Sequence, residues 1–320
     1  MISIVVPVLN EEQNLAPLHR EIDEVLRRSG LDAEMIIVDD GSKDRSWNEI
    51  TQLASRDPRV QGIRFRRNFG KAAALSAGFA CVRGDMVVTL DADLQDNPSE
   101  IPGLIDRLEA GFDLVNGWKR QRYDPWHKVI PSRIFNWMIR LASGLQLHDH
   151  NCGLKGYRVE VTREIRIYGE LHRFITLLAH ARGFRVTEME VQHRPRIHGQ
   201  SNYGVERFVK GFLDLLTVRV LTLFGERPLH FLGTTGLVAF AVGFSGLVYL
   251  AWLWVTGHRP IGTRPVLIYS AASLLLGAQM MSAGIVAELI VSRLSSDSPG
   301  RSYGIAERIG FDRENERDSD

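Results

Sequence analysis

The chemistry that this chain could perform centres on two aspartates that follow a short apolar stretch. Residues 86–90 are apolar and rich in β-branched side chains, which predicts a buried strand. Asp91 and Asp93 come next, and on an extended backbone residues i and i+2 share a face. Two nearby carboxylates repel each other unless a cation lies between them, and hard oxygen ligands suit Mg²⁺ or Mn²⁺. Solvated loop aspartates are the alternative, but the carboxyl end of a buried strand is the usual ligand crevice of an open α/β sheet.

The elements that would position these aspartates alternate between strands and helices. We expect strands at 2–9, 34–38, 60–65, 86–90 and 113–117, and helices beginning at Asn10 as N-cap and at about 46–55, 72–82 and 101–108. This alternation predicts a mostly parallel, doubly wound sheet. Further along, 130–145 reads as a helix, and 152–158 and 186–193 read as strands. Lys71 follows a glycine at a helix start, where it could bind an anion or simply be solvated.

Two long uncharged runs near the end of the chain indicate membrane spans. Residues 231–255 and 265–287 contain no charged side chain, and each run exceeds the roughly 20 residues that cross a bilayer. A buried soluble hairpin is the alternative. Residues 205–224 are amphipathic and precede the first run, so we expect an interfacial helix. The last stretch, 293–320, is charged without an apolar period, which predicts a disordered tail.

Composition narrows the function classes. The net charge is +1, so the chain has no broad nucleic-acid signature. Its two cysteines, Cys81 and Cys152, form no metal or redox spacing, and their low number indicates a reducing compartment. The first residues lack the basic region of a signal peptide, so we expect the amino-terminal part to stay in the cytoplasm.

Five segments together resemble the family-two glycosyltransferases with a GT-A fold, and in particular the membrane-anchored polyisoprenyl-phosphate glycosyltransferases. They are Val-Val-Pro-Val-Leu-Asn-Glu-Glu at 5–12, Val-Asp-Asp-Gly-Ser-Lys-Asp at 38–44, Arg-Asn-Phe-Gly-Lys at 67–71, Leu-Asp-Ala-Asp-Leu-Gln-Asp-Asn-Pro at 90–98, and Arg-Ile-His-Gly-Gln-Ser-Asn-Tyr-Gly at 196–204. The resemblance runs from residue 2 to about residue 290. One departure is Asn202, where such enzymes often carry Lys or Arg, and this puts a phosphate contact there in doubt.

The resemblance implies an α/β, Rossmann-like GT-A catalytic domain, with a mostly parallel sheet, followed by a two-helix transmembrane hairpin. It divides the chain into a catalytic domain at 1–204, an interfacial helix at 205–228, two spans within 229–292 (about 231–255 and 265–290) and the tail. It implies inverting transfer of a sugar from a UDP- or GDP-linked donor to a polyisoprenyl phosphate at the cytoplasmic face of the membrane. Both termini would be cytoplasmic and the 257–264 connector external, and we also expect a homo-oligomer.

The same resemblance implies roles for individual residues. Nucleotide-sugar binding falls to Pro7, Asn10, Glu11, Asp39, Asp40, Lys71, Asp91, Ala92, Gln95 and Arg196. A Mg²⁺ or Mn²⁺ ion would be held by Asp91, Asp93 and Gln95, with Asp93 as the direct ligand, and would offset the charge of the leaving diphosphate. Asp93, Asp149 and Arg196 are the catalytic candidates. For Asp39 and Asp40, ordinary turn chemistry in Asp-Gly-Ser is the alternative.

The acceptor side carries less specific signals. Asp149 lies where inverting relatives place a catalytic carboxylate, but a phosphate acceptor is already anionic, so Asp149 could instead orient the acceptor or bind metal. A zinc site at His148, Asp149 and His150 lacks a further ligand set. Candidates for the lipid phosphate, each of which could also be a solvated surface charge, are Arg120, Arg122, Lys128, Arg133 and Arg173.

Two other functions remain open at this point. A processive polysaccharide synthase would share the nucleotide site, but its Gln-x-x-Arg-Trp motif is absent here. A catalytically degenerate membrane scaffold would not need Asp91, Asp93, Gln95 and Arg196, all of which are present.

Overall fold

The structure is a computed structural model that describes residues 1–120, 145–165, 167–169, 171–194, 228–258, 260, 262, 264–296 and 305–309. The chain divides into two compact units, one formed by Met1–Val218 with Arg301–Asp320 and the other by Arg219–Gly300. The helices predicted at 130–145 and 205–224 lie outside the described residues.

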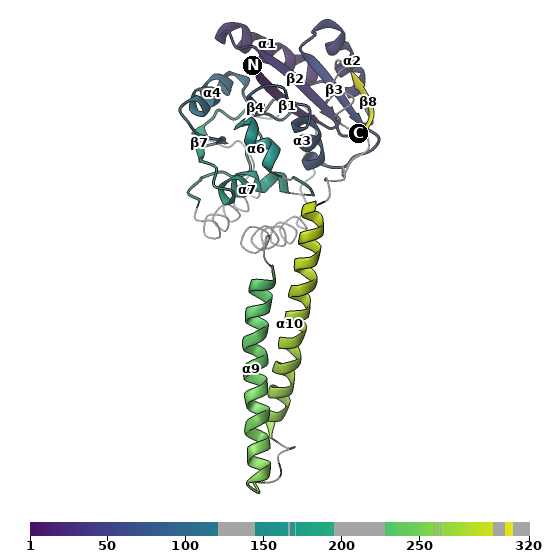
Figure 1. Ribbon diagram of the computed structural model, residues 1–320. Coiled ribbons are helices and arrows are strands. Elements are labelled where there is room, and N and C mark those ends of the chain that lie inside the picture. Colours follow the sequence, from purple (N-terminus) through teal and green to yellow (C-terminus); the bar gives the residue numbers. More distant parts are fainter. Residues whose placement is uncertain are drawn as a thin grey trace. The chain divides into compact units, whose positions relative to one another are not determined.

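The first unit is built on one mixed sheet (Figure 1). Its strands are β1 (Ile2–Val8), β2 (Ala33–Asp39), β3 (Val60–Phe65), β4 (Met86–Thr89), β5 (Leu114–Trp118), β6 (Lys155–Arg158), β7 (Val186–Glu190) and β8 (Ile305–Ile309), in the spatial order β7-β5-β6-β4-β1-β2-β3-β8. Strands β1 to β4 are mutually parallel and β5 pairs parallel with β7, whereas β6 runs antiparallel between β4 and β5 and β8 runs antiparallel to β3.

Helices cover both faces of this sheet because the strands are apolar on both sides. One face packs against α1 (Leu15–Ser29), α2 (Ser46–Arg56) and α4 (Ile101–Glu109), which follows the short helix η1 (Pro98–Glu100). The other face packs against α3 (Lys71–Phe79), α6 (Val159–Glu164), η2 (Leu171–Phe174) and α7 (Ile175–Ala181). Along β1, Ile4 and Val6 face the first layer and Val5 faces the second, as the period of a strand requires. The predicted doubly wound sheet is confirmed.

Two predictions about local structure are wrong. Asn10 is not a helix cap: its backbone has φ of +57°, and α1 begins only at Leu15. The tail is not disordered throughout, because Ile305–Ile309 forms the edge strand β8. Ile309 packs into the first core layer beside Gly62 of β3, where a Cβ would lie 2.7 Å from Ile309 Cγ2. Five residues are too few to show a clear period in a charged stretch.

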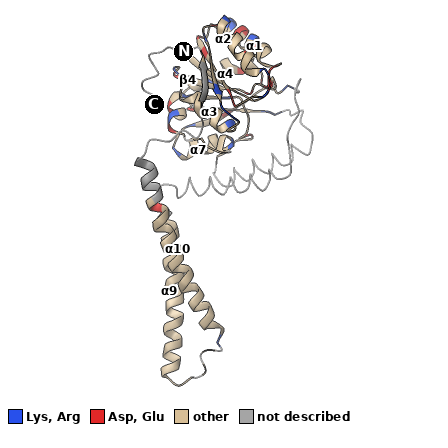
Figure 2. Cartoon of the chain, turned by 90° about the vertical axis from the view of Figure 1, so that its right-hand side faces the viewer, with Lys and Arg blue, Asp and Glu red and all other residues tan. Residues whose placement is uncertain are grey.

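The second unit is a hairpin of two long apolar helices, α9 (Pro228–Val255) and α10 (Pro265–Ser296). Leu229–Val255 and Pro265–Leu289 are long and apolar enough to cross a membrane. Their described turns are almost free of charge (Figure 2). Small residues let the two backbones approach closely: a Cβ on Gly243 would lie 2.4 Å from Leu274 N, and one on Gly277 would lie 2.5 Å from Phe240 N.

A buried carboxylate fixes the amino end of the sheet, away from the strand ends that carry the predicted site. Glu34, at 2% exposure, accepts hydrogen bonds from Ser3 Oγ (2.6 Å), Gln61 Nε2 (2.9 Å), Arg83 N (2.7 Å) and Arg83 Nε (2.8 Å). It thereby joins β1, β2, β3 and the turn before β4.

We predict that Glu34→Gln destabilises the first unit. The amide would present N–H groups to donors and remove the negative charge that faces Arg83, at a cost of about 2 kcal/mol. That cost corresponds to a fall in Tm of roughly 4–8 °C in thermal unfolding of the detergent-purified protein. Glu24→Gln is the matched control, since within the described part of the chain Glu24 pairs with exposed Arg28 alone, and such pairs contribute about 0.5 kcal/mol. Equal shifts for the two variants would contradict the role of Glu34.

Candidate active site

The site lies where the parallel strands β1, β2 and β4 end. The chain proceeds from β1 to β2 and β3 on one side and returns to place β4 on the other side of β1. The loops after β1 and β4 therefore diverge, and a crevice forms outside their carboxyl ends, as is usual for ligand sites in such sheets. Asp39 is the last residue of β2, and Asn10 and Asp91 follow β1 and β4, so the topology brings the predicted nucleotide-site residues to one edge.

Hydrogen bonds tie the loop after β1 to the loop after β2. Asn10 N donates to Ser42 Oγ (2.9 Å), Lys43 N donates to Asn10 Oδ1 (2.8 Å), and Glu11 N donates to Ser46 Oγ (2.9 Å). These bonds hold Asn10 in its left-handed conformation, which asparagine tolerates better than most residues. Asn10 and Glu11 thus lie beside the Asp-Gly-Ser turn, although 30 residues separate them in the sequence.

Asp39 has one satisfied and one unsatisfied carboxylate oxygen. Its Oδ1 accepts a hydrogen bond from Ser42 N at 2.9 Å, as the turn interpretation predicts. Its Oδ2 is buried and has no hydrogen-bond partner within the described part of the chain, and Arg64 Nε lies 3.7 Å away. A buried acceptor without a donor is costly, so this oxygen is suited to an N–H or O–H group of a ligand.

Asp40 holds the loop after β3. Its two oxygens accept from Phe69 N (2.7 Å) and Gly70 N (2.9 Å), and burial raises its pKa despite these bonds. Gly41, with φ of +71°, lets the loop approach, because a Cβ there would lie 2.4 Å from the carbonyl carbon of Arg67. Asp40 therefore shapes the site by placing the residues just before Lys71.

The loop after β4 carries the Asp-x-Asp pair. Strand β4 ends at Thr89, so Asp91 and Asp93 lie in an irregular turn and not on an extended strand. Asp93 is 8% exposed and its Oδ1 accepts from Gln95 N at 3.2 Å. Leu94, between Asp93 and Gln95, has φ of +60°, a conformation that costs about 1–3 kcal/mol in a residue other than glycine. Ala92 packs into the core and offers no polar side chain.

Lysines balance the carboxylates of this loop. Lys71 Nζ lies 2.5 Å from Asp91 Oδ1, and Lys119 Nζ lies 2.7 Å from Asp96 Oδ1. Burial alone would lower the pKa of each lysine, but the neighbouring carboxylates outweigh it and raise both. For Asp91, burial opposes ionisation, yet the Lys71 charge holds its pKa below the ordinary value. At neutral pH the loop is therefore charged and internally paired.

The segment 149–153 closes the other side of Asp91. Gly153 is in tight contact, since a Cβ there would lie 2.6 Å from both Cγ and Oδ2 of Asp91. Thr89 Oγ1 donates to the Gly153 carbonyl at 3.0 Å. Asp149 is 2% exposed, its Oδ1 accepts from Asn151 N at 3.1 Å, and its carbonyl accepts from Asn116 Nδ2.

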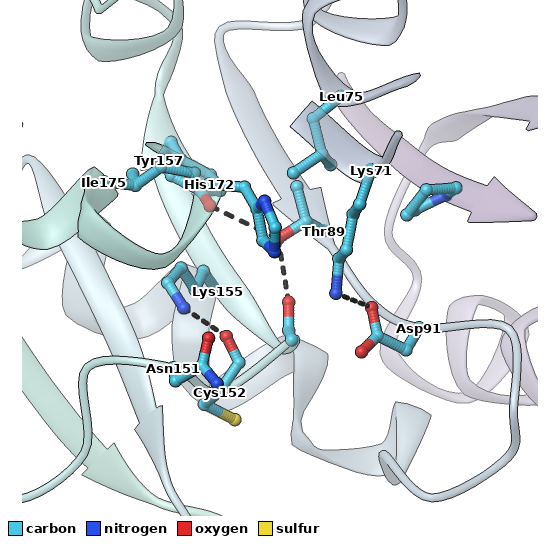
Figure 3. Close-up of a pocket in the computed structure, with 12 residues that line it drawn as sticks. Lys71, Leu75, Thr89, Asp91, Asn151, Cys152, Lys155, Tyr157, His172 and Ile175 are labelled. Carbon is cyan, nitrogen blue, oxygen red and sulfur yellow. Dashed lines mark hydrogen bonds and ion pairs between the residues drawn. The ribbon is translucent and has the colours of Figure 1, made fainter. Parts of the chain in front are cut away.

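A small pocket lies beside Asp91 (Figure 3). It is lined by Pro7, Lys71, Leu75, Thr89, Asp91, Asn151, Cys152, Gly153, Lys155, Tyr157, His172 and Ile175. Of the residues predicted to bind the nucleotide sugar, the structure brings Pro7, Lys71 and Asp91 to this pocket, and Asn10, Glu11, Asp39 and Asp40 to the loops at the same sheet edge.

The predicted acceptor-side residues have different surroundings. Arg173 is 8% exposed in η2 and is not a solvated surface charge. Arg120 is exposed and its Nη1 lies 3.4 Å from Glu190 Oε2. His148 pairs with Glu188 and stacks on Trp118, whereas His150 is buried against Thr176 Oγ1 at 2.9 Å. No cluster of three or more metal-ligating side chains occurs within the described residues, so the zinc interpretation gains no support. Arg122, Lys128, Arg133 and Arg196 lie outside those residues.

Sequence reasoning missed several polar residues of the site. Lys119 and His172 lie in stretches without any motif, Lys155 was given no role of its own, and only the fold brings the three residues near Asp91. Arg194 was missed as well. Its backbone N donates to the Gln95 carbonyl (2.9 Å), and its guanidinium donates to Asn97 Oδ1 (2.7 Å) and Glu21 Oε2 (2.7 Å). The chain therefore runs past the Asp-x-Asp loop just before the Arg196 segment.

A mostly parallel sheet with an Asp-x-Asp loop at its switch point defines a GT-A-like glycosyltransferase domain. The profile of Glycosyl transferase family 2 matches residues 3–166. The chain is 36% identical over 307 residues to the dodecaprenyl-phosphate galacturonate synthase of Rhizobium johnstonii, covering 94% of this chain and 91% of that protein. It is 33% identical over 302 residues to the undecaprenyl-phosphate 4-deoxy-4-formamido-L-arabinose transferase of Edwardsiella ictaluri, covering 94% and 91%. The chain belongs to glycosyl transferase family 2 and is a glycosyltransferase.

The fold is also that of a solved structure. The glucosyl-3-phosphoglycerate synthase from Mycobacterium tuberculosis, in complex with Mn²⁺, UDP and phosphoglyceric acid, has a TM-score of 0.55 at 20% identity. The similarity covers 69% of this chain and 78% of that chain. It confirms the GT-A-like fold, and membership of an enzyme family removes the scaffold interpretation.

We predict that Gly153→Ala damages catalysis without unfolding the protein. Its methyl group would collide with the Asp91 carboxylate and displace it, so kcat should fall at least about tenfold, equivalent to about 1.4 kcal/mol. Gly103→Ala is the matched control, because a Cβ at Gly103 meets only the flexible Met189 side chain, with Sδ at 3.1 Å. The measurement is the rate of nucleoside diphosphate release with unchanged Tm. Normal activity of Gly153→Ala would show that Asp91 need not stay in place.

Proposed function

We propose that the protein transfers a single sugar, with inversion, from a nucleotide sugar to a polyprenyl phosphate at a membrane surface. The observation that supports this most is the Asp91–Asp93 loop at the sheet's switch point, flanked by Lys71 and by the unsatisfied oxygen of Asp39. The polyprenyl-phosphate acceptors named for both relatives, each aligned over 94% of this chain, support the acceptor class.

The donor would lie across the ends of β1, β2 and β4. Asp39 Oδ2 would accept a hydrogen bond from the base or ribose, and the loop of Asn10 and Glu11, which is tied to the Asp39 turn, would form the wall beside it. Lys71 lies at the start of α3 and faces Asp91, where the diphosphate would be placed. Each group therefore matches one part of a nucleoside diphosphate sugar: a hydrogen-bond acceptor for the base or ribose, and a cation for the phosphates.

The donor set of the Asp91–Gln95 loop fits a divalent cation. It offers two carboxylates and an amide, all hard oxygen donors, within one short turn that contains the strained Leu94. The solved fold neighbour binds Mn²⁺. Asp93 would be the direct ligand, with Asp91 and Gln95 beside it. Such an ion, when bound, stabilises the negative charge that develops on the leaving diphosphate. Asp91 would then be balanced by that ion, and Lys71 would become available to the donor phosphates.

Two further residues complete the proposal. Arg194 is hydrogen-bonded to Gln95, and Arg196 follows it by two residues, so we assign Arg196 to the diphosphate on the strength of the motif and this connection. Asp149 would orient the acceptor from the segment that closes the site beside Asp91. Asp149 need not act as a general base on the acceptor, because the phosphate monoester that attacks the sugar is already ionised at neutral pH.

The metal assignment predicts that Asp93→Asn abolishes transfer at nearly constant side-chain volume. Loss of a charged ligand should raise the barrier by about 3 kcal/mol or more, which lowers kcat by roughly a hundredfold. The assay extracts labelled lipid product from membranes after incubation with nucleotide sugars and undecaprenyl phosphate. EDTA should abolish transfer by the wild type in the same way, and added Mn²⁺ should restore that transfer. Near-normal transfer by Asp93→Asn, together with indifference to EDTA, would remove the ion from the mechanism.

We also propose that α9 and α10 anchor the enzyme in the cytoplasmic membrane, with both termini in the cytoplasm and the 257–264 connector outside. Nucleotide sugars are made in the cytosol, so the donor pocket must face it. A cysteine placed at Thr263 should react with an impermeant maleimide in intact cells. Ser29→Cys, on the exposed end of α1, should react only after lysis. If Thr263→Cys were labelled only after lysis, the connector would lie in the cytoplasm, and the proposed topology would be wrong.

A further inference from the structure

The pocket beside Asp91 contains a lysine that has no carboxylate partner among the described residues. Lys155 of β6 is 3% exposed, and its Nζ donates to the Cys152 carbonyl. No carboxylate of the described ranges lies within ion-pair distance of it, although Lys71 and Lys119 each have one. Burial lowers the pKa of Lys155, as expected for an ammonium group without a close counter-ion. An uncompensated buried charge is strongly destabilising, so its presence calls for a partner that arrives with a ligand.

The same pocket contains His172, a neutral histidine with one ring nitrogen that makes no hydrogen bond to the described residues. His172 Nδ1 is buried and has no hydrogen-bond partner among the residues that the structure describes. Burial, together with the charges of Lys71 and Arg173, holds its pKa well below the ordinary value. A neutral imidazole can donate one N–H, and Figure 3 shows His172, Lys155 and Asn151 on the walls of one pocket. A cation and a neutral donor therefore line a common space.

The size of this space limits what enters it. The cavity is about 20 Å³, which accommodates one water-sized group and not a sugar or a base. A ligand therefore reaches it with a single small polar end, such as one oxygen of an anionic group. The donor diphosphate already has Lys71 and the Asp91–Gln95 loop as its proposed partners, and Lys155 lies on a different wall of the pocket from Lys71 (Figure 3).

Glycosyl transfer to a phosphate brings two anions together. An oxygen of the acceptor phosphate forms a bond to the anomeric carbon while the bond from that carbon to the nucleoside diphosphate breaks, and inversion places the two on opposite sides of the sugar. Their repulsion must be offset on the acceptor side as well as on the donor side. Resting on the proposed function, we infer that Lys155 and His172 form a subsite for a phosphoryl oxygen of the acceptor lipid.

The test compares wild type with Lys155→Met, in which an apolar side chain of similar length removes the charge. Thermal unfolding is followed with farnesyl phosphate, with farnesol as the neutral matched lipid, and with UDP plus Mn²⁺. Farnesyl phosphate should raise the Tm of wild type, and farnesol should not. Lys155→Met should keep or raise the ligand-free Tm, bind farnesyl phosphate at least about tenfold more weakly, and retain its response to UDP.

Kinetics provide an independent readout. Lys155→Met should raise KM for the lipid phosphate by at least about tenfold and leave KM for the donor within about twofold, and Lys155→Arg should restore much of the loss. If Lys155→Met lowered the ligand-free Tm and bound farnesyl phosphate as well as the wild type, Lys155 would have a structural role through its hydrogen bond to Cys152, and the inference would be overturned. If Lys155→Met instead lost its response to UDP, Lys155 would bind an oxygen of the donor diphosphate, and this result would also overturn the inference. Lys155-dependent stabilisation by farnesyl phosphate without any lipid glycosylation would support the subsite while contradicting the proposed function.

Discussion

The ion pair between Lys71 and Asp91 is the interaction on which the rest of the site depends. A carboxylate in a partly desolvated crevice needs a positive charge close by, and a lysine at the start of α3 supplies it at 2.5 Å. Asp40 holds the loop that delivers this lysine, and Gly153 leaves room for the carboxylate. The paired state keeps the crevice stable without ligands and occupies the position where a donor diphosphate and its metal ion would enter.

The sheet explains why these groups meet. Parallel strands end at one edge, and reversal of the strand order at β1 separates the loops after β1 and β4. Hydrogen bonds then replace helix or strand structure in the loops at this edge, as between Asn10 N and Ser42 Oγ. In the second unit, small residues take the place of such a network, because Gly243 and Gly277 let the two apolar helices pack closely.

Much of this arrangement could be predicted from the sequence. Apolar periods located the strands that lead to Asp39 and Asp91, and the uncharged runs located α9 and α10. The unpredicted parts depend on long-range contacts. Lys119 and Lys155 come near Asp91 only because β6 pairs with β4 and β5 pairs with β6, and β8 is a strand only because β3 offers an open edge. The sequence indicated a helix cap at Asn10 because an asparagine side chain bonds to nearby backbone N–H groups both in turns and at helix starts.

The most direct measurement is the structure of the enzyme with UDP and Mn²⁺, with the ion located by its anomalous scattering. We predict that the ion lies about 2 Å from a carboxylate oxygen of Asp93 and that Lys71 Nζ moves from Asp91 toward the diphosphate. An intact Lys71–Asp91 pair beside bound UDP, with Mn²⁺ bound away from the Asp91–Gln95 loop, would contradict it.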